Sequence, residues 1–456
     1  MPSTPNTPST PNTGTSNPHA RPVIIPVRSA PVQGKPSAQV LATLDPRWRA
    51  RYLLLAPHRL GFFLALLVLL ASGMWWALVQ LDRSSGLLGL PYALSPTLVH
   101  AAVMVFGFIP LFFSGFLFTA GPKWLDVEPY AARVLLLPLL LQALGWLLWL
   151  GAAQWHVMAG LVALVLAWSG LSRMTWLFWR LIDHSQIPDQ LHARTVGVAC
   201  AVGCLCLGAL AVGLALGAWD MALAWVLSGL WGFVLVVYVT VAHRMIPFFT
   251  SSAMPFIAAW RPFWVLGLML AAAAVETLAV WVEFQGAPSS AWTLVRAVFE
   301  LAAGGVLLWL AVVWGLVQSL KNRLLAMLHI GFVWLGLSLV LGGAAQLLGW
   351  LQGSAVLSLG ALHALTIGCL ASLMLAMVTR VSCGHSGRAL VADNVVWALF
   401  WLLQLTALLR IAAAASHALA SHVLLPTALL WCGIMLVWGL RLCGWYGRVR
   451  ADGRAG

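Results

Sequence analysis

The sequence predicts an all-α polytopic membrane protein with about 12 transmembrane helices, and its composition is the first observation that predicts it. Of the 456 residues, 62% are hydrophobic and only 8% are charged, with a mean hydropathy of +0.93. A soluble globular domain carries about 25% charged residues. A chain this apolar is therefore expected to place most of its surface in a lipid bilayer.

Hydrophobic patterning is the second observation. Apolar stretches of about 20 residues follow one another along the chain, and each is long enough to cross a bilayer as a helix. Helices are expected because no water is present in lipid to satisfy the backbone. The predicted spans lie at 60–81, 98–120, 131–151, 155–179, 195–218, 221–242, 263–285, 291–317, 325–350, 355–378, 395–415 and 419–440.

The basic residues predict how these spans are oriented. With a cytoplasmic N-terminus, 22 of the 25 Lys and Arg residues fall in segments predicted to lie inside, as the positive-inside rule requires. Of the other three, Arg83 lies outside, and Arg296 and Arg410 lie within spans. Both termini are therefore predicted to be cytoplasmic. The net charge of +13 reflects topology, so a nucleic-acid partner is not expected.

The composition divides the chain into three parts. Residues 1–45 repeat Pro, Ser, Thr and Asn and offer nothing to bury, so a disordered tail is expected. Residues 46–448 form the membrane domain, and 449–456 form a second tail. The seven cysteines include no C-x-x-C pair. Cys200 and Cys204 lie one helical turn apart, where thiolates can hold copper or small side chains can simply pack.

Two histidines are the leading candidates for chemistry. His100 lies at the outer end of the second predicted span, and His363 enters the tenth from the same side. An imidazole in hydrocarbon must find a partner. Two such imidazoles at comparable depth can clamp a haem iron between helices. The alternative is that each histidine only bonds a backbone carbonyl on a neighbouring helix.

Charged residues within the seventh and eighth spans form a second candidate group. Arg296 and Glu300 are spaced i,i+4, which allows an ion pair on one helix face, and Glu276 lies at similar depth. Charges within a membrane pair with one another and face the interior or water. These three residues are expected to hold haem propionates, relay a proton or clamp two helices together.

A third group lies at the cytoplasmic ends of the spans. Pro247 is expected to stop the sixth span soon after His243. Metal ligands or an anion entry are expected among the histidines and arginines here, although basic residues also arise from topology alone. The candidates are His243, His329 and His385 as metal ligands, and Arg380 and Arg388 as groups that bind a cofactor.

Three segments together resemble the NnrS family. They are HALTIGCLASLMLAMVTRVSCGHSGR (363–388), HRMIPFFT (243–250) and MVFGFIPLFFSGFLFTAGPKW (104–124). The resemblance covers about residues 57–448 and implies a bacterial inner-membrane protein that carries haem b and copper. It also implies a link to the response to nitric oxide and nitrosative stress, with a respiratory-chain component as an expected partner.

The chain departs from the family pattern at the second span. Relatives usually continue from the first histidine with a small residue, a second histidine and a glutamate, whereas this chain has His100-Ala101-Ala102-Val103. His243 stands where relatives often have glycine. A fainter similarity to the arrangement of haem–copper oxidase main subunits rests on span number and on His100 and His363. Because the histidine pairs of the dioxygen-reducing centre are missing, an oxidase is rejected.

Three functions follow from these observations. The first is a haem- and copper-binding protein of nitric oxide tolerance, with His100 and His363 as axial ligands; whether it turns over a substrate is left open. The second is a transporter that uses the Glu–Arg–Glu group, although no six-plus-six repeat is evident. The third is an assembly factor that delivers haem or copper to a respiratory enzyme.

Overall fold

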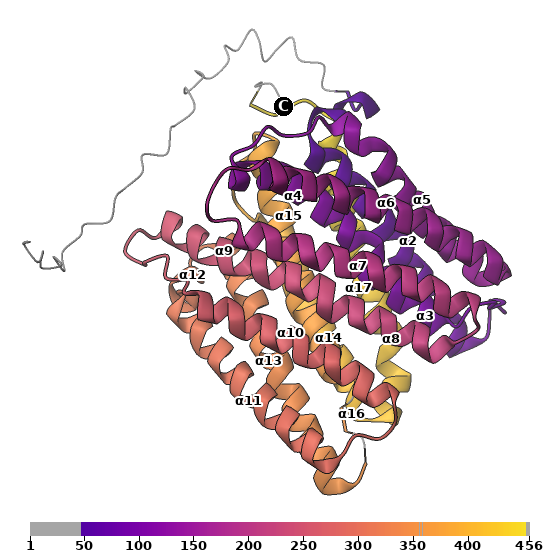
Figure 1. Cartoon of the computed structure of the whole chain (residues 1–456). Helices are drawn as coiled ribbons and strands as arrows, with labels where there is room; N and C mark the ends of the chain where they lie inside the picture. The colour runs from indigo at the N-terminus through magenta and orange to yellow at the C-terminus, as the bar shows by residue number, and fades with distance from the viewer. Residues whose placement is uncertain (1–46, 355, 358, 453–456) are drawn as a thin grey trace, which may run out of the picture.

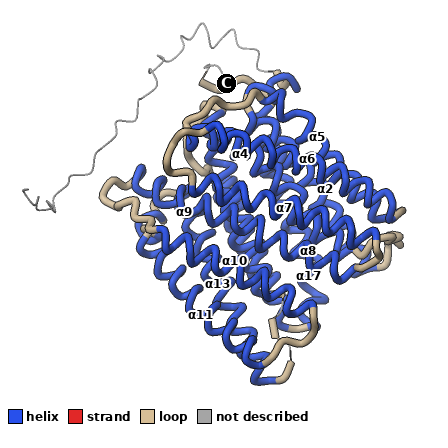
Figure 2. The backbone as a smooth tube through the Cα atoms, viewed as in Figure 1, coloured by secondary structure: helices blue, strands red, loops and turns tan. Residues whose placement is uncertain are grey.

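The computed structural model describes residues 47–452 except 355 and 358, and every regular element among them is helical (Figure 2). Within these residues, 12 helices are long and apolar enough to cross a membrane, which confirms the predicted class and span number. The predicted disordered tail, 1–45, lies outside the described residues.

Nine of the spans are single helices and three contain a π-helical insert. The single helices are α2 (Pro57–Ser85), α5 (Ala132–Trp155), α6 (Val157–His184), α7 (Leu191–Ala215), α10 (Phe263–Phe284), α11 (Ser290–Val313), α13 (Arg323–Gln352), α16 (Asn394–Ala415) and α17 (His417–Tyr446). The interrupted spans are α3-η2-α4 (Pro96–Ala102, Val103–Gly107, Phe108–Leu125), α8-η3-α9 (Trp219–Gly229, Leu230–Leu235, Val236–Ala253) and α14-η4-α15 (Gly360–His363, Ala364–Ala371, Ser372–His385). Two short elements, the 3₁₀ helix η1 (Ala50–Leu55) and α12 (Leu316–Ser319), lie outside the spans.

Both ends of the described chain lie on one side of the bundle, at the top of Figure 1. We call this the inner side, following the positive-inside rule, and the opposite one the outer side. The C-terminal segment is tied down here. The Arg59 guanidinium donates to the carbonyls of Tyr446 and Arg448 (3.3 and 2.7 Å), and the Ala451 amide donates to the Ser386 carbonyl (2.8 Å). The last residues therefore join the first span to the loop after the tenth.

The second, sixth, ninth and tenth spans form the centre of the bundle. In the second span, 78% of the central window is buried inside the protein, against 33% in the last span, Ala418–Tyr446. Around this centre, α5 packs on α6, α11 packs on α13, and α16 and α2 both pack on α17 (Figure 1). The spans that carry the candidate histidines are therefore mostly surrounded by protein rather than by lipid.

Helix starts follow local chemistry. Proline at the first helical position begins both α2 and α3, because its missing N–H is not needed there. The side chains of Ser289 and Asp393 cap α11 and α16 by accepting backbone N–H groups. Arg441 also donates to the Asp393 carboxylate, and this hydrogen bonding lowers the pKa of Asp393. The pairing is therefore lost only as pH falls through that lowered pKa.

The expectation that Pro247 stops the sixth span was wrong. Helix α9 continues through Pro247 to Ala253. A proline inside a helix removes one backbone hydrogen bond, but packed neighbours hold membrane helices together across such a break. Here Ile246 is buried, and the Thr250 hydroxyl, one turn beyond the proline, bonds the His329 ring at 2.9 Å. Tertiary contacts thus outweigh the local break.

Helices α11 and α13 approach closely at glycines. A Cβ atom on Gly304 would lie 2.7 Å from the Gly336 carbonyl oxygen, which is closer than van der Waals contact allows. Small residues permit this approach, as is typical of helix pairs in membranes. The next residue, Gly305, has no atom within 4 Å of the same position and so offers a matched control.

We expect Gly304→Ala to lower the free energy of unfolding by about 1–3 kcal/mol, because the two backbones must move apart. Gly305→Ala is expected to leave stability unchanged or to raise it, because alanine favours a helix. Thermal unfolding of both variants in one detergent measures the difference. Equal stability of the two variants would contradict the close packing of α11 on α13.

Candidate functional site

His100 is held by aromatic stacking at the outer end of the second span. Its ring lies on that of Trp76, with centroids 3.9 Å apart and planes 18° apart, and the Arg83 guanidinium also lies over Trp76, 5.6 Å from the ring centroid. The Nδ1 atom of His100 is buried and has no hydrogen-bond partner among the described residues. The ring is therefore fixed while a nitrogen remains available to a ligand.

His363 is oriented by its own helix. It is the last residue of α14, near the start of the tenth span, so it lies closer to the outer surface than predicted. A backbone carbonyl can only accept, so the Nδ1–H of His363 donates to the Leu359 carbonyl, at 2.8 Å. The other ring nitrogen, Nε2, then carries a lone pair. This is the arrangement that ligating histidines in proteins usually have.

A π-helical segment follows each of these histidines. η2 begins three residues after His100, and η4 begins directly after His363. Pro110 lies in the first turn after η2, where its ring and missing N–H disturb the turn before it. π-Helical turns interrupt the regular backbone ladder and are frequent at functional sites. Both histidines thus stand at local distortions of otherwise regular spans.

A polar network from the neighbouring helices α13 and α16 holds the segment η4. Trp334 of α13 donates its ring N–H to Gln404 of α16 (2.7 Å), and Gln404 donates to Ser372 (2.9 Å), the first residue after η4. All three side chains are buried. Fully bonded buried networks rigidify the elements they join. The backbone that carries His363 is therefore positioned by two neighbouring helices.

Two arginines lie beside the outer histidines. Arg410 lies within electrostatic range of both His100 and His363, and Arg83 lies within electrostatic range of His100. The two histidines, which are the predicted ligands, also lie within electrostatic range of each other at the outer side. The sequence placed Arg410 within a span without assigning it a role. Arg410 could have been identified from the sequence as a candidate, because an arginine inside a span is rare and marks a functional site.

The predicted ion pair between Arg296 and Glu300 is confirmed, and it belongs to a larger group. The Arg296 Nε donates to Glu300 at 2.7 Å, and its two terminal nitrogens donate to Glu276 at 2.6 Å and Glu283 at 2.5 Å. Gln346 of α13 also donates to Glu300, at 2.8 Å. Sequence reasoning missed Glu283 and Gln346. Because three carboxylates already engage Arg296, the group does not favour haem propionates.

This acidic group lies at the base of a large cavity, which we call the outer vestibule. The vestibule has a volume of about 850 Å³ and is bounded by α10, α11, α13 and the outer loops at Pro288 and Ser354. Its wall also includes Ala361 and Leu362, the residues just before His363. The vestibule therefore connects the acidic group to the outer surface near the histidine pair.

The inner histidines lie in three separate places. The ring nitrogens of His243 and His192 are 3.0 Å apart, and His243 also donates to the Pro262 carbonyl at 3.2 Å. The His329 ring bonds the Thr250 hydroxyl, and the His385 ring lies 4.4 Å from that of His58. Among the described residues, no three His, Cys, Asp or Glu side chains are grouped to hold a metal ion.

Arg380 and Arg388 stack on aromatic rings at the inner side. Arg380 lies 3.9 Å from the ring centroid of Phe249, and Arg388 lies 4.4 Å from that of Trp445. Seventeen residues of helix separate His363 from Arg380, a rise of about 25 Å. Neither arginine therefore reaches a group bound by the outer histidines, and both are consistent with inner-surface anchoring.

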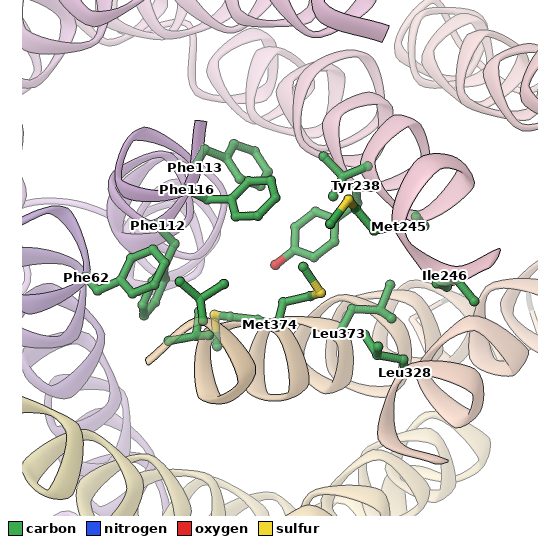
Figure 3. Close-up of a pocket in the computed structure, with 15 residues that line it drawn as sticks. Phe62, Phe112, Phe113, Phe116, Tyr238, Met245, Ile246, Leu328, Leu373 and Met374 are labelled. Carbon is green, nitrogen blue, oxygen red and sulfur yellow. The ribbon is translucent and has the colours of Figure 1, made fainter. Parts of the chain in front are cut away.

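An apolar cavity of about 70 Å³ lies in the inner half of the bundle, at α2, α4, α9, α13 and α15. Figure 3 shows phenylalanines of α4 facing methionines of α15, with the Tyr238 hydroxyl pointing into the space. Phe62 on its wall touches the ring of His58, and His58 is buried against His385. The sequence did not indicate this cavity, because five helices distant in the chain form it.

The cysteines add no further site. All seven are free, and Cys204 contacts the Thr175 hydroxyl at 3.3 Å. Cys200 and Cys206 are buried. This arrangement is consistent with packing between α6 and α7.

Comparison with known proteins identifies the family. A family model described as NnrS protein matches residues 52–450, which is nearly the whole membrane domain. None of the curated proteins compared with the chain is similar enough to count as a relative. The match includes every span and all ten candidate residues, and it confirms the resemblance seen in the sequence. This multi-pass membrane protein belongs to the NnrS family.

Proposed function

We propose that this protein binds haem b near the outer surface of the bacterial inner membrane and acts in tolerance of nitric oxide. Membership of the NnrS family supports the link to the nitric oxide response. Copper is proposed as a second metal, without assigned ligands. A respiratory-chain component is the proposed partner, because a haem that cycles between oxidation states needs an electron donor.

One observation carries this proposal: His100 and His363 lie within electrostatic range of each other, and each has a ring nitrogen available for a ligand. The charge around them supports the proposal of a haem. Arg410 and Arg83 supply positive charge for two propionates, whose carboxylates pair well with guanidinium groups. The spans are surrounded mainly by apolar side chains, which suit the rest of the macrocycle.

Each protein group would have a distinct task. The imidazoles of His100 and His363 would provide the axial nitrogens, Trp76 would hold the first ring by stacking, and the Leu359 carbonyl would fix the tautomer of the second. A bound haem supplies a one-electron redox centre. With both His100 and His363 as ligands, the haem would favour electron transfer or sensing over direct reaction with nitric oxide.

Purification of the full chain from cells grown with ample iron tests this proposal. The optical spectrum is expected to show a Soret band and the split visible bands of a low-spin iron, with one b-type haem per chain on extraction. Elemental analysis of the same sample measures copper. A preparation that is folded, as judged by cooperative thermal unfolding, yet holds no haem would overturn the proposal.

Transport is the second candidate function, because the outer vestibule reaches buried charged residues. Such residues at membrane depth commonly bind substrates or coupling ions. Counterflow in proteoliposomes distinguishes the two functions. Substrate flux by a haem-free preparation would favour transport.

A further inference from the structure

The outer vestibule carries an excess of negative charge. Its charged lining consists of three carboxylates, Glu276, Glu283 and Glu300, against one guanidinium, Arg296. The other packed elements contribute no charge within this lining: α13 faces the group with Gln346, and η3 faces it with Trp231. Arg296 balances only one carboxylate. At least one more positive charge is needed to neutralise the buried part of the group.

Glu300 has one oxygen without a partner. Its Oε1 accepts from both Arg296 and Gln346, whereas its Oε2 is buried and unbonded among the described residues. The side chain is only 2% exposed. Space for this oxygen is provided by Gly342, where a Cβ atom would lie 2.5 Å from it. A buried oxygen of this kind needs a hydrogen-bond or ionic partner.

The nearest candidate partner is a second carboxyl group. Glu276, which is 4% exposed, shares a guanidinium nitrogen with Glu300: the Arg296 Nε lies 3.5 Å from the Glu276 Oε1 and 2.7 Å from the Glu300 Oε1. Two ionised carboxylates in contact repel each other, so such pairs hold one proton between them. A single proton on this pair gives the unbonded oxygen a partner and removes one negative charge. The shared proton thus accounts for both the excess negative charge of the vestibule and the unbonded oxygen of Glu300.

We propose that Glu276 and Glu300 form a reversible proton-binding site that exchanges with the outer aqueous phase through the vestibule. Hydronium delivers a proton to the Glu300 Oε2, which then donates it in a hydrogen bond to Glu276, and water takes the proton up again on release. Arg296 stays charged throughout. Its guanidinium contacts both carboxyl groups, so a metal cation at the same place would meet a positive charge within bonding distance.

The position of the site supports exchange with the outer side. Glu300 lies about 15 Å of helix rise from Ser290, at the outer end of α11. Ser290, Thr293 and Arg296 line the vestibule along this length. Glu283, nearer the mouth, has a side chain that is 54% exposed. Water therefore reaches the group along one helix face.

Infrared difference spectroscopy of the full chain in vesicles tests the proposal. At neutral pH, the wild type is expected to show the carbonyl stretch of a protonated carboxyl group, shifted by deuterium oxide. Glu300→Gln and Glu276→Gln are each expected to lose this band, because the one buried carboxylate that remains is balanced by Arg296 and no longer shares a proton with a second buried carboxylate. Glu283→Gln is the matched control and is expected to keep it.

Access and ligand identity are tested in the same vesicles. Raising the external pH is expected to remove the band reversibly, and added sodium is expected to have no effect. The absence of the band at neutral pH, its persistence in both Glu276→Gln and Glu300→Gln, or its insensitivity to external pH would overturn the proposal. Displacement of the band by sodium would assign the site to a metal cation instead. Because two single variants are used, failure of one to fold leaves the other informative.

Discussion

Replacing either outer histidine with alanine is expected to reduce haem content per chain by at least about tenfold. Even outer-shell partners of a metal ligand change metal affinity by about 10–100-fold, and a lost axial ligand removes a bond to the iron itself. His363→Ala also removes the hydrogen bond to the Leu359 carbonyl. Haem extraction and the height of the Soret band at fixed protein concentration measure the effect.

The inner histidines provide the matched control for this experiment. His58 and His385 are also a close ring pair, and His58 is as buried as a core residue. We expect His58→Ala and His385→Ala to leave haem content within a factor of two of the wild type. Loss of haem in only the His58→Ala and His385→Ala variants would instead assign the haem to the apolar cavity of Figure 3.

The second large effect is expected from Arg296→Met, which should lower the free energy of unfolding by about 3–5 kcal/mol. Removing one member of a buried ion group leaves the others unpaired in a low-dielectric environment. Here Glu276 and Glu300, both almost fully buried, lose the one guanidinium partner that they have among the described residues. Thermal unfolding in detergent at neutral pH gives the change.

Two further measurements separate charge from packing in this variant. Adding Glu276→Gln and Glu300→Gln to Arg296→Met is expected to restore most of the loss, because the unpaired charges are gone. Acidic pH is expected to restore stability as well, since protonation neutralises the carboxylates. Arg173→Met, at an exposed arginine stacked on Trp176, is expected to stay within about 0.5 kcal/mol of the wild type. If Arg296→Met matches Arg173→Met, the ion group does not stabilise the fold.

The sequence was sufficient to predict the spans but not their ends. The span predicted at 419–440 is a helix from His417 to Tyr446, and the one predicted at 60–81 is a helix from Pro57 to Ser85. Apolar windows stop at the first polar residues, whereas helical hydrogen bonds continue through the membrane interface. The predicted stop at Pro247 failed for a related reason, because contacts beyond the proline keep α9 helical.

The candidate site was only partly predictable. His100 and His363 could be identified from the sequence because polar residues within apolar spans are conspicuous, and the Arg296–Glu300 pair follows from helical spacing. The neighbours of these residues could not be identified from the sequence. These contacts depend on how each helix is rotated and on which helices are adjacent. They are the approach of Arg410 to the two outer histidines, of His58 to His385, and of Gln346 to Glu300. Hydrophobic periodicity is too weak in spans that are apolar all round to fix that rotation.

The attachment of the C-terminal segment to the first span has a consequence for biogenesis. Arg59 in α2 cannot make its bonds to the Tyr446 and Arg448 carbonyls until residues 446–448 have left the ribosome. The first of the described spans must therefore wait for the last of them before this part of the inner side is complete. Nascent chains arrested before this point would leave a buried guanidinium without acceptors, a defect that quality-control proteases can recognise.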